Sequence, residues 1–263
     1  AAVASEMVAS GMEPSGFTGS IHSTLPVGSG LSSSAALEVA AALALGAIGT
    51  PVEIAELCQR AERLASGVPC GVMDQLAIAS GVEGQALMID CHALRVIPVP
   101  MPPDATITVL HSGRSRELAG SAYAERRDQC ATAEAIIGPL RLASPEALAT
   151  IDDEVVRRRA RHVIGENARV RSFADAMRRG DLASAGEVMV ESHRSLALDF
   201  DVSTPELDHL VDSLIATPGV HGARLTGAGF GGCVVALSDP EVELTGPAGV
   251  WRVRPSTAAH RMG

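Results

Sequence analysis

The sequence contains no lysine, so all 21 of its basic residues are arginine. A Walker A phosphate loop needs a lysine, and a protein kinase needs a lysine on a strand near the ATP phosphates. The absence of lysine therefore excludes both classes of nucleotide-binding protein. A phosphate-binding loop in this chain must be of another kind.

Aromatic residues are scarce, with one Trp, one Tyr and four Phe, so the core must consist of Ala, Val, Leu and Ile. The longest apolar stretch, 35–48, is too short to span a membrane and contains Glu38. An excess of basic charge is also absent. The net charge is −10 and the pI about 5.2, whereas a nucleic-acid-binding face is usually basic. We therefore expect no membrane and no nucleic acid as partner. The arginine-rich stretches at Arg157–Arg161 and Arg178–Arg179 are flanked by acids, which predicts solvated helix faces.

The five cysteines are odd in number, scattered, and nowhere spaced as CxxC. This pattern indicates reduced thiols in a cytoplasmic protein and gives no support to a structural zinc site. The sequence shows no signal peptide. The chain begins with Ala1 rather than Met, and residues 1–12 already have the pattern of a helix, so we expect further sequence upstream.

The most informative stretch is residues 25–37, LPVGSGLSSSAAL. Pro26, Gly28 and Gly30 end an extended run and let the backbone pass close to a ligand. Ser32–Ser34 offer N-cap hydroxyls to a helix over 35–45. Free N–H groups at such a helix start attract phosphate, and one hydroxyl can ligate Mg²⁺. A plain glycine turn before a helix is the alternative. The dinucleotide fingerprint is excluded because its third glycine is missing.

Two carboxylates complement this loop. Asp74 follows a Pro-Cys-Gly loop at the start of a helix, and Glu62 lies near the end of the preceding helix. Taken alone, Asp74 is a first-turn acid and Glu62 a surface partner of Arg60 or Arg63. Phosphoryl transfer needs a phosphate cradle, Mg²⁺ held by hard oxygens and a group that orients the attacking hydroxyl. Taken together, Ser34 and Glu62 are candidate Mg²⁺ ligands, and Asp74 is a candidate for facing the acceptor.

A second glycine cluster, residues 226–232, contains more small residues than a tight hairpin needs, which favours a second close approach to ligand. His162 and His193 lie between polar neighbours in helices, and we expect structural roles for both. Tyr123, taken alone, is a core phenol with a hydrogen-bonded tip.

Periodicity and turn signals predict an α+β protein without internal repeats. The prolines of 98–103 indicate a hinge or domain edge. We expect helices at 1–12, 32–45, 51–65, 115–137, 144–148, 152–179, 182–196 and 203–216. We expect strands at 16–25, 85–90, 95–99, 105–110, 220–225, 233–237 and 250–254.

Several segments resemble the galactokinases, which belong to the superfamily of galactokinase, homoserine kinase, mevalonate kinase and phosphomevalonate kinase. LPVGSGLSSSAALEVA is similar to the phosphate loop of that superfamily, in the triple-serine form of galactokinases. GVPCGVMDQLAIASGVEGQALMIDCHAL is similar to the galactokinase segment that carries the catalytic aspartate. GARLTGAGFGGCVVAL is similar to the third superfamily motif. The resemblance runs from about residue 16 to 253.

The resemblance implies a two-domain α+β sugar kinase with its active site between the domains. Residues 1–109 correspond to an incomplete N-terminal domain, like domain 2 of ribosomal protein S5, and 110–263 to a ferredoxin-like α/β sandwich. The implied reaction is transfer of phosphate from ATP, with Mg²⁺, to the anomeric hydroxyl of D-galactose in the Leloir pathway. We expect a monomeric, cytoplasmic enzyme.

Residue roles carry over by position. The implied ATP-binding residues are Pro26, Gly28, Ser29, Gly30, Leu31, Ser32, Ser33 and Ser34. Ser34 and Glu62 hold Mg²⁺, Asp74 is catalytic, and Gly71, Asp74 and Tyr123 contact the sugar. Gly227, Ala228, Gly229 and Gly231 form the third-motif loop.

One motif of the family, Arg-Val-Asn-Leu-Ile-Gly-Glu-His-Thr-Asp-Tyr, is absent and corresponds to sequence before residue 1. It supplies the arginine paired with the catalytic aspartate, and loss of such a donor costs roughly 10²–10³ in rate. We therefore expect impaired catalysis by these 263 residues. The alternatives are a superfamily kinase acting on N-acetylgalactosamine, or a sensor that binds ATP and galactose without turnover.

Overall fold

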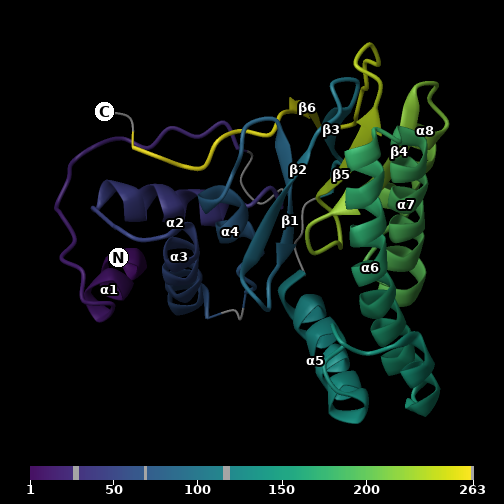
Figure 1. Cartoon of the computed structure of the whole chain (residues 1–263), viewed down its shortest axis with the longest axis horizontal. Helices are drawn as coiled ribbons and strands as arrows, with labels where there is room; N and C mark the ends of the chain where they lie inside the picture. Colours follow the sequence, from purple (N-terminus) through teal and green to yellow (C-terminus); the bar gives the residue numbers. More distant parts are fainter. Residues whose placement is uncertain (26–29, 68–69, 115–118, 262–263) are drawn as a thin grey trace. The chain divides into compact units, whose positions relative to one another are not determined.

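In this computed structural model, residues 1–25, 30–67, 70–114 and 119–261 are described (Figure 1). They form two compact units. The first is built mainly from residues up to Pro100 together with the segment from Pro255, and the second from Met101–Arg254. Within the described part of the chain, no helix combines the length and apolar character that a membrane crossing requires.

The described residues of the first unit form four helices and one hairpin. Its elements are α1 (Ala2–Ala9), α2 (Ser33–Ala44), α3 (Pro51–Ser66), α4 (Met73–Ala79), β1 (Gln85–Asp90) and β2 (Arg95–Pro100). α3 begins sharply because Thr50 and Glu53 form a capping box and Pro51 occupies the first helical position. Met7, Val39 and Leu57 pack α1, α2 and α3 around one core.

The C-terminal segment runs along α4. The Ala259 N–H donates to the Ile78 carbonyl at 3.0 Å, and the Gly84 N–H donates to the Pro255 carbonyl at 3.3 Å. A Cβ atom at Gly81 would lie 2.7 Å from the Ser256 carbonyl oxygen, so only glycine fits there. Residues 255–259 therefore pack within the first unit.

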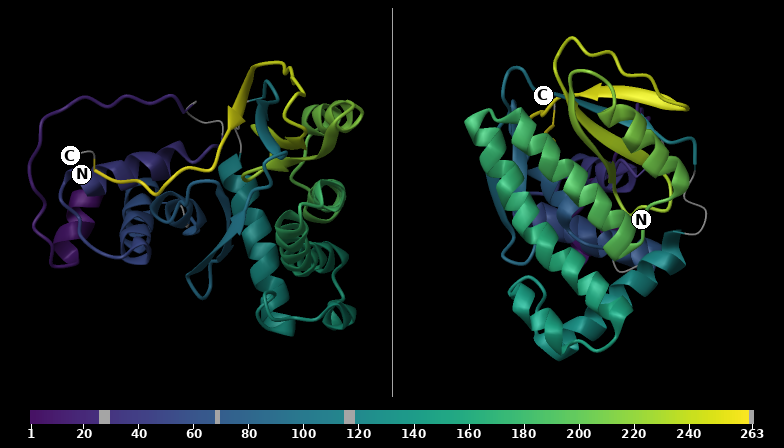
Figure 2. Two further views of the ribbon diagram at one scale, coloured as in Figure 1. Left: turned by 45° about the horizontal axis from the view of Figure 1, so that its top comes forward. Right: turned by 90° about the vertical axis from the view of Figure 1, so that its right-hand side faces the viewer.

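The second unit contains a four-stranded antiparallel sheet (Figure 2). Its strands are β3 (Thr106–His111), β4 (Val220–Thr226), β5 (Cys233–Ser238) and β6 (Gly249–Val253), in the order β4-β5-β3-β6. Helices α5 (Ala119–Ile137), α6 (Glu154–Arg179), α7 (Leu182–Ser195) and α8 (Pro205–Ile215) lie between β3 and β4 in the chain. A 3₁₀-helix, Pro145–Thr150, precedes α6, and a π-helical turn, Leu196–Phe200, follows α7.

This strand order confirms the expected ferredoxin-like α/β sandwich. One crossover departs from that pattern, because the described residues 239–248 between β5 and β6 contain no helix. α8 supplies Leu207 and Leu210 to a core that also holds Leu225 of β4 and Val234 of β5. α6 and α7 lie side by side (Figure 1).

Two expectations fail in the helices and strands. Residues 16–25 form no strand, and Phe17 and Ile21 are exposed by 58% and 75%. A strand needs a partner ladder, and none of the described strands pairs with this segment. The run Arg157–Arg161 is not uniformly solvated, since Arg159 is only 3% exposed. Polar acceptors from distant segments of the chain surround that guanidinium.

A backbone-to-backbone approach fixes α7 on β4. A Cβ at Gly186 would lie 1.9 Å from the His221 carbonyl oxygen, and a Cβ at Gly222 would lie 2.3 Å from the Gly186 carbonyl oxygen. No side chain fits between the two elements at this point.

We therefore predict that Gly222→Ala lowers the free energy of unfolding by at least the amount typical of overpacking, roughly 1–3 kcal/mol. The matched control is Gly16→Ala, because an added Cβ there meets nothing within 4 Å. Urea unfolding of both variants and the parent measures the difference. Equal midpoints for the two variants would contradict the close approach.

Candidate active site

The described backbone at the start of α2 has an uncommon conformation. Gly30 and Ser32 both have positive φ, 81° and 55°, and the Ser32 side chain makes no capping hydrogen bond. The predicted N-cap role of the Ser32 hydroxyl is therefore wrong. The Ser32 side chain thus satisfies none of the free N–H groups that begin every helix. Pro26, Gly28 and Ser29, also predicted here, lie outside the described residues.

The structure brings Ser34 and Glu62 together from α2 and α3. The Ser34 hydroxyl donates to Glu62 Oε1 at 2.8 Å. Hydroxyl and carboxylate oxygens are hard ligands of the kind that Mg²⁺ prefers. The chemistry of this pair of oxygens therefore fits a magnesium ion.

Gln75 is fully buried and joins two carboxylates. Its Nε2 donates to Glu62 Oε2 at 2.7 Å and to Glu38 Oε2 at 3.1 Å. Its Oε1 is buried without a hydrogen-bond partner among the described residues. One amide thereby links α2, α3 and α4.

Sequence reasoning missed both Glu38 and Gln75. The available signal was Glu38 as the single charge within an apolar helix, because a charge buried in such a helix requires a partner. The Gln75 partner follows Asp74 directly in the sequence.

Burial raises the pKa of Glu38 to about 7, and repulsion from Glu62 adds to this, although the Gln75 hydrogen bond opposes it. The Glu38 carboxyl therefore holds its proton more tightly in the folded protein than in the unfolded chain.

Asp74 occupies the first turn of α4. Three hydrogen bonds to the Cys70 carbonyl oxygen, from Gln59 and Arg63 of α3, fix the preceding loop. Among the described residues, no hydrogen bond or ion pair engages the Asp74 carboxylate. A Cβ at Gly71 would meet nothing within 4 Å, so the space beside this loop is open. The carboxylate is therefore available to an incoming group.

The third-motif loop belongs to the second unit and joins β4 to β5, as predicted. Its backbone has positive φ at Gly227, Gly229, Phe230, Gly231 and Gly232. A Cβ at Gly229 would lie 2.3 Å from the Val202 carbonyl oxygen. The loop therefore passes too close to Val202 for any residue with a side chain to replace Gly229.

Tyr123 of α5 is 36% exposed, so its interpretation as a core phenol is wrong. The two histidines have structural contacts. His162 Nδ1 lies 3.0 Å from Ser195 Oγ, and burial lowers the pKa of this histidine to about 4. His193 Nε2 lies 3.1 Å from Asp208 Oδ1, and its Nδ1 accepts from the Leu225 N–H.

The comparisons with known proteins agree with this geometry. The profile "GHMP kinases N terminal domain" matches residues 1–82, and "GHMP kinases C terminal" matches residues 173–244. Together they account for more than half of the chain. The chain belongs to the GHMP kinase family.

Among GHMP kinases, the chain is similar to galactokinases. It is 45% identical to the human galactokinase over 232 residues, which are 84% of this chain and 59% of that protein. It is 43% identical to the Chloroflexus aggregans galactokinase over 236 residues, covering 84% and 60%. The chain thus spans about three fifths of the curated relatives that it matches.

Solved structures of GHMP kinases are also similar to this chain. The galactose complex of Lactococcus lactis galactokinase has a TM-score of 0.86 and 29% identity, covering 98% of this chain and 74% of that one. A mevalonate kinase structure has a TM-score of 0.61 at 21% identity, which supports the fold alone.

We predict that Glu38→Gln flattens the pH dependence of stability. Because unfolding releases the extra proton of Glu38, the free energy of unfolding falls as the pH rises from 4.5 to 7. The variant loses this contribution. Urea unfolding at several pH values from 4.5 to 8 measures it, with the exposed Glu83→Gln as matched control. A Glu38→Gln profile that parallels the parent would show that partial burial does not raise the pKa of this carboxyl.

Proposed function

We propose that this chain supplies the nucleotide-binding, magnesium-binding and catalytic groups of an ATP-dependent kinase that phosphorylates the anomeric hydroxyl of D-galactose. The observation that carries the proposal is the linked set of Ser34, Glu62 and Gln75 next to Asp74. The similarity to galactokinases supports galactose as acceptor.

In the proposed reaction, the N–H groups at the start of α2 bind the phosphates of ATP. Ser34 and Glu62 would hold Mg²⁺, which supplies positive charge to the phosphate oxygens when bound. Asp74 orients the anomeric hydroxyl and takes its proton as the sugar oxygen attacks the γ-phosphorus. The bond between that phosphorus and the β–γ bridging oxygen breaks, and ADP leaves. The products are galactose 1-phosphate and ADP.

We also propose roles for the remaining candidates. Gly71 and Tyr123 contact the sugar, and the third-motif loop, Gly227–Gly231, supports the sugar and the phosphates. No basic side chain among the described residues pairs with Asp74. We therefore expect these 263 residues alone to react about 10²–10³ more slowly than a chain that carries the family's arginine-containing first motif.

A coupled ADP-release assay with Mg²⁺, ATP and galactose tests the proposal. The chain is compared with a version extended by its upstream coding sequence, and N-acetylgalactosamine is offered as the competing acceptor. Galactose-dependent ADP release in either version supports the proposal. Preference for N-acetylgalactosamine, or binding of ATP and galactose without turnover in both versions, would overturn it.

We predict that Asp74→Asn lowers kcat by roughly 10²–10⁴, the usual contribution of a positioned acid or base, because the amide cannot take the proton. Binding of ATP, measured by calorimetry in the presence of Mg²⁺, stays unchanged. The exposed Asp104→Asn is the matched control and retains full activity. An Asp74→Asn variant as active as Asp104→Asn would remove Asp74 from the mechanism.

A further inference from the structure

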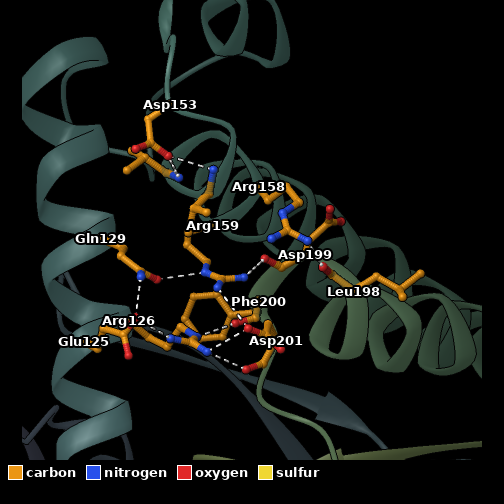
Figure 3. Close-up of polar contacts among 12 residues, drawn as sticks. Glu125, Arg126, Gln129, Asp153, Arg158, Arg159, Leu198, Asp199, Phe200 and Asp201 are labelled. Atoms are coloured by element: carbon orange, nitrogen blue, oxygen red, sulfur yellow. Dashed lines mark hydrogen bonds and ion pairs between the residues drawn. The ribbon is translucent and has the colours of Figure 1, made fainter.

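Two buried arginines share one carboxylate in the second unit. Arg126 of α5 and Arg159 of α6 are 7% and 3% exposed. Arg126 Nη2 lies 2.9 Å from Asp201 Oδ2, and Arg159 Nη2 lies 3.1 Å from the same oxygen (Figure 3). Buried guanidinium groups are rare and require acceptors on all sides. Their other contacts therefore indicate what they hold in place.

Both guanidinium groups bind the backbone of the turn that follows α7. Arg126 Nε donates to the Phe200 carbonyl at 2.8 Å, and its Nη2 donates to the Asp201 carbonyl at 2.9 Å. Arg159 Nη1 donates to the Asp199 carbonyl at 2.6 Å. Asp201 has a φ of 58°, which is uncommon for a residue with a side chain. The two arginines thus hold a turn that the backbone alone disfavours.

The turn supports the third-motif loop directly. The Val202 carbonyl, next to Asp201, accepts a 2.7 Å hydrogen bond from the Phe230 N–H. Gly229 passes so close to the same carbonyl that no Cβ fits. The Arg126 guanidinium carbon also lies 5.8 Å from the centre of the Phe230 ring, within the range of a cation–π contact. The conformation of the loop therefore depends on the turn and on Arg126.

Arg126 also connects this loop to the helix of a candidate sugar contact. Tyr123 lies three residues before Arg126 on α5, and residues at this spacing share one helix face. One guanidinium thus links the α5 face that carries Tyr123 to the loop Gly227–Gly231. Only the planar fork of arginine reaches two carbonyls and a carboxylate at once, whereas a lysine is a single point charge.

We propose that Arg126, with Arg159 behind it, is a positioning residue that fixes the third-motif loop relative to α5 for phosphoryl transfer. This inference rests on the proposed function. It assigns no contact with substrate to either arginine. Their effect on the reaction passes through the Asp199–Val202 turn and the Phe230 amide.

The test is Arg126→Lys, which keeps the charge and the stem but loses the fork. Hydrogen exchange followed by mass spectrometry reports on peptides covering 227–232, with α8 as the internal reference. We expect exchange in 227–232 to rise at least tenfold and exchange in α8 to stay at the parent value. In the version of the chain that turns over galactose, kcat falls at least tenfold, while the KM for ATP stays within twofold.

Arg178→Lys is the matched control, because among the described residues Arg178 forms only a surface ion pair with Asp175 within α6. If Arg126→Lys does not fold, Gln129→Met takes its place. Gln129 Oε1 accepts from Arg159 Nε at 2.8 Å, so this variant loosens the network without removing a charge. We expect it to give a smaller increase in loop exchange.

A merely stabilising role predicts a lower thermal midpoint with unchanged loop exchange and unchanged kcat, and that result would overturn the inference. Increased loop exchange with an unchanged kcat would overturn it as well. If no version of the chain phosphorylates galactose, the proposed function fails. In that case the exchange data still decide whether Arg126 holds the loop.

Discussion

The amide of Gln75 is the contact on which the arrangement of the first unit depends. It places one donor nitrogen between Glu38 and Glu62, two carboxylates that would otherwise repel each other in a partly buried site. Because the three residues come from α4, α2 and α3, the amide sets how these helices meet. Ser34 is bound to Glu62, so its hydroxyl depends on the same contact. Asp74 precedes Gln75 in the first turn of α4, so the contact that holds Gln75 also holds the backbone of Asp74 in place.

The second unit also contains like charges in a buried site, but there the charges are positive. There, two buried guanidinium groups share the carboxylate of Asp201. Their other N–H groups donate to backbone carbonyls of the turn and to side-chain acceptors such as Gln129. In both units, a charge removed from water is compensated by groups from separate segments of the chain. In both units, the compensated cluster also lies next to residues for which we propose a part in phosphoryl transfer.

Local signals in the sequence predicted most of the fold. The helices expected from residues 51, 152 and 203 begin within two residues of those positions, where Thr50, Asp153 and Thr204 cap α3, α6 and α8 in the structure. Residues 16–25 alternate like a strand, but alternation cannot show whether a partner strand is present. The Arg157–Arg161 run looked solvated, because the acceptors of Arg159 are 30 to 42 residues distant in sequence. For the site, spacing singled out Ser34, Glu62 and Asp74, whereas Glu38 and Gln75 appear only when three helices come together.

The close approach of Gly186 to Gly222 completes a closed ring of backbone contacts in the second unit. From Gly222, the path follows β4 to the third-motif loop and crosses to Val202 through the Phe230 hydrogen bond. It then returns along the π-helical turn and α7 to Gly186, which touches Gly222 again. Because the ring is closed, a displacement of one of these segments also requires a displacement of its neighbours. The position of the third-motif loop is therefore set by the backbone of the sheet, through β4 on one side and through the turn after α7 on the other.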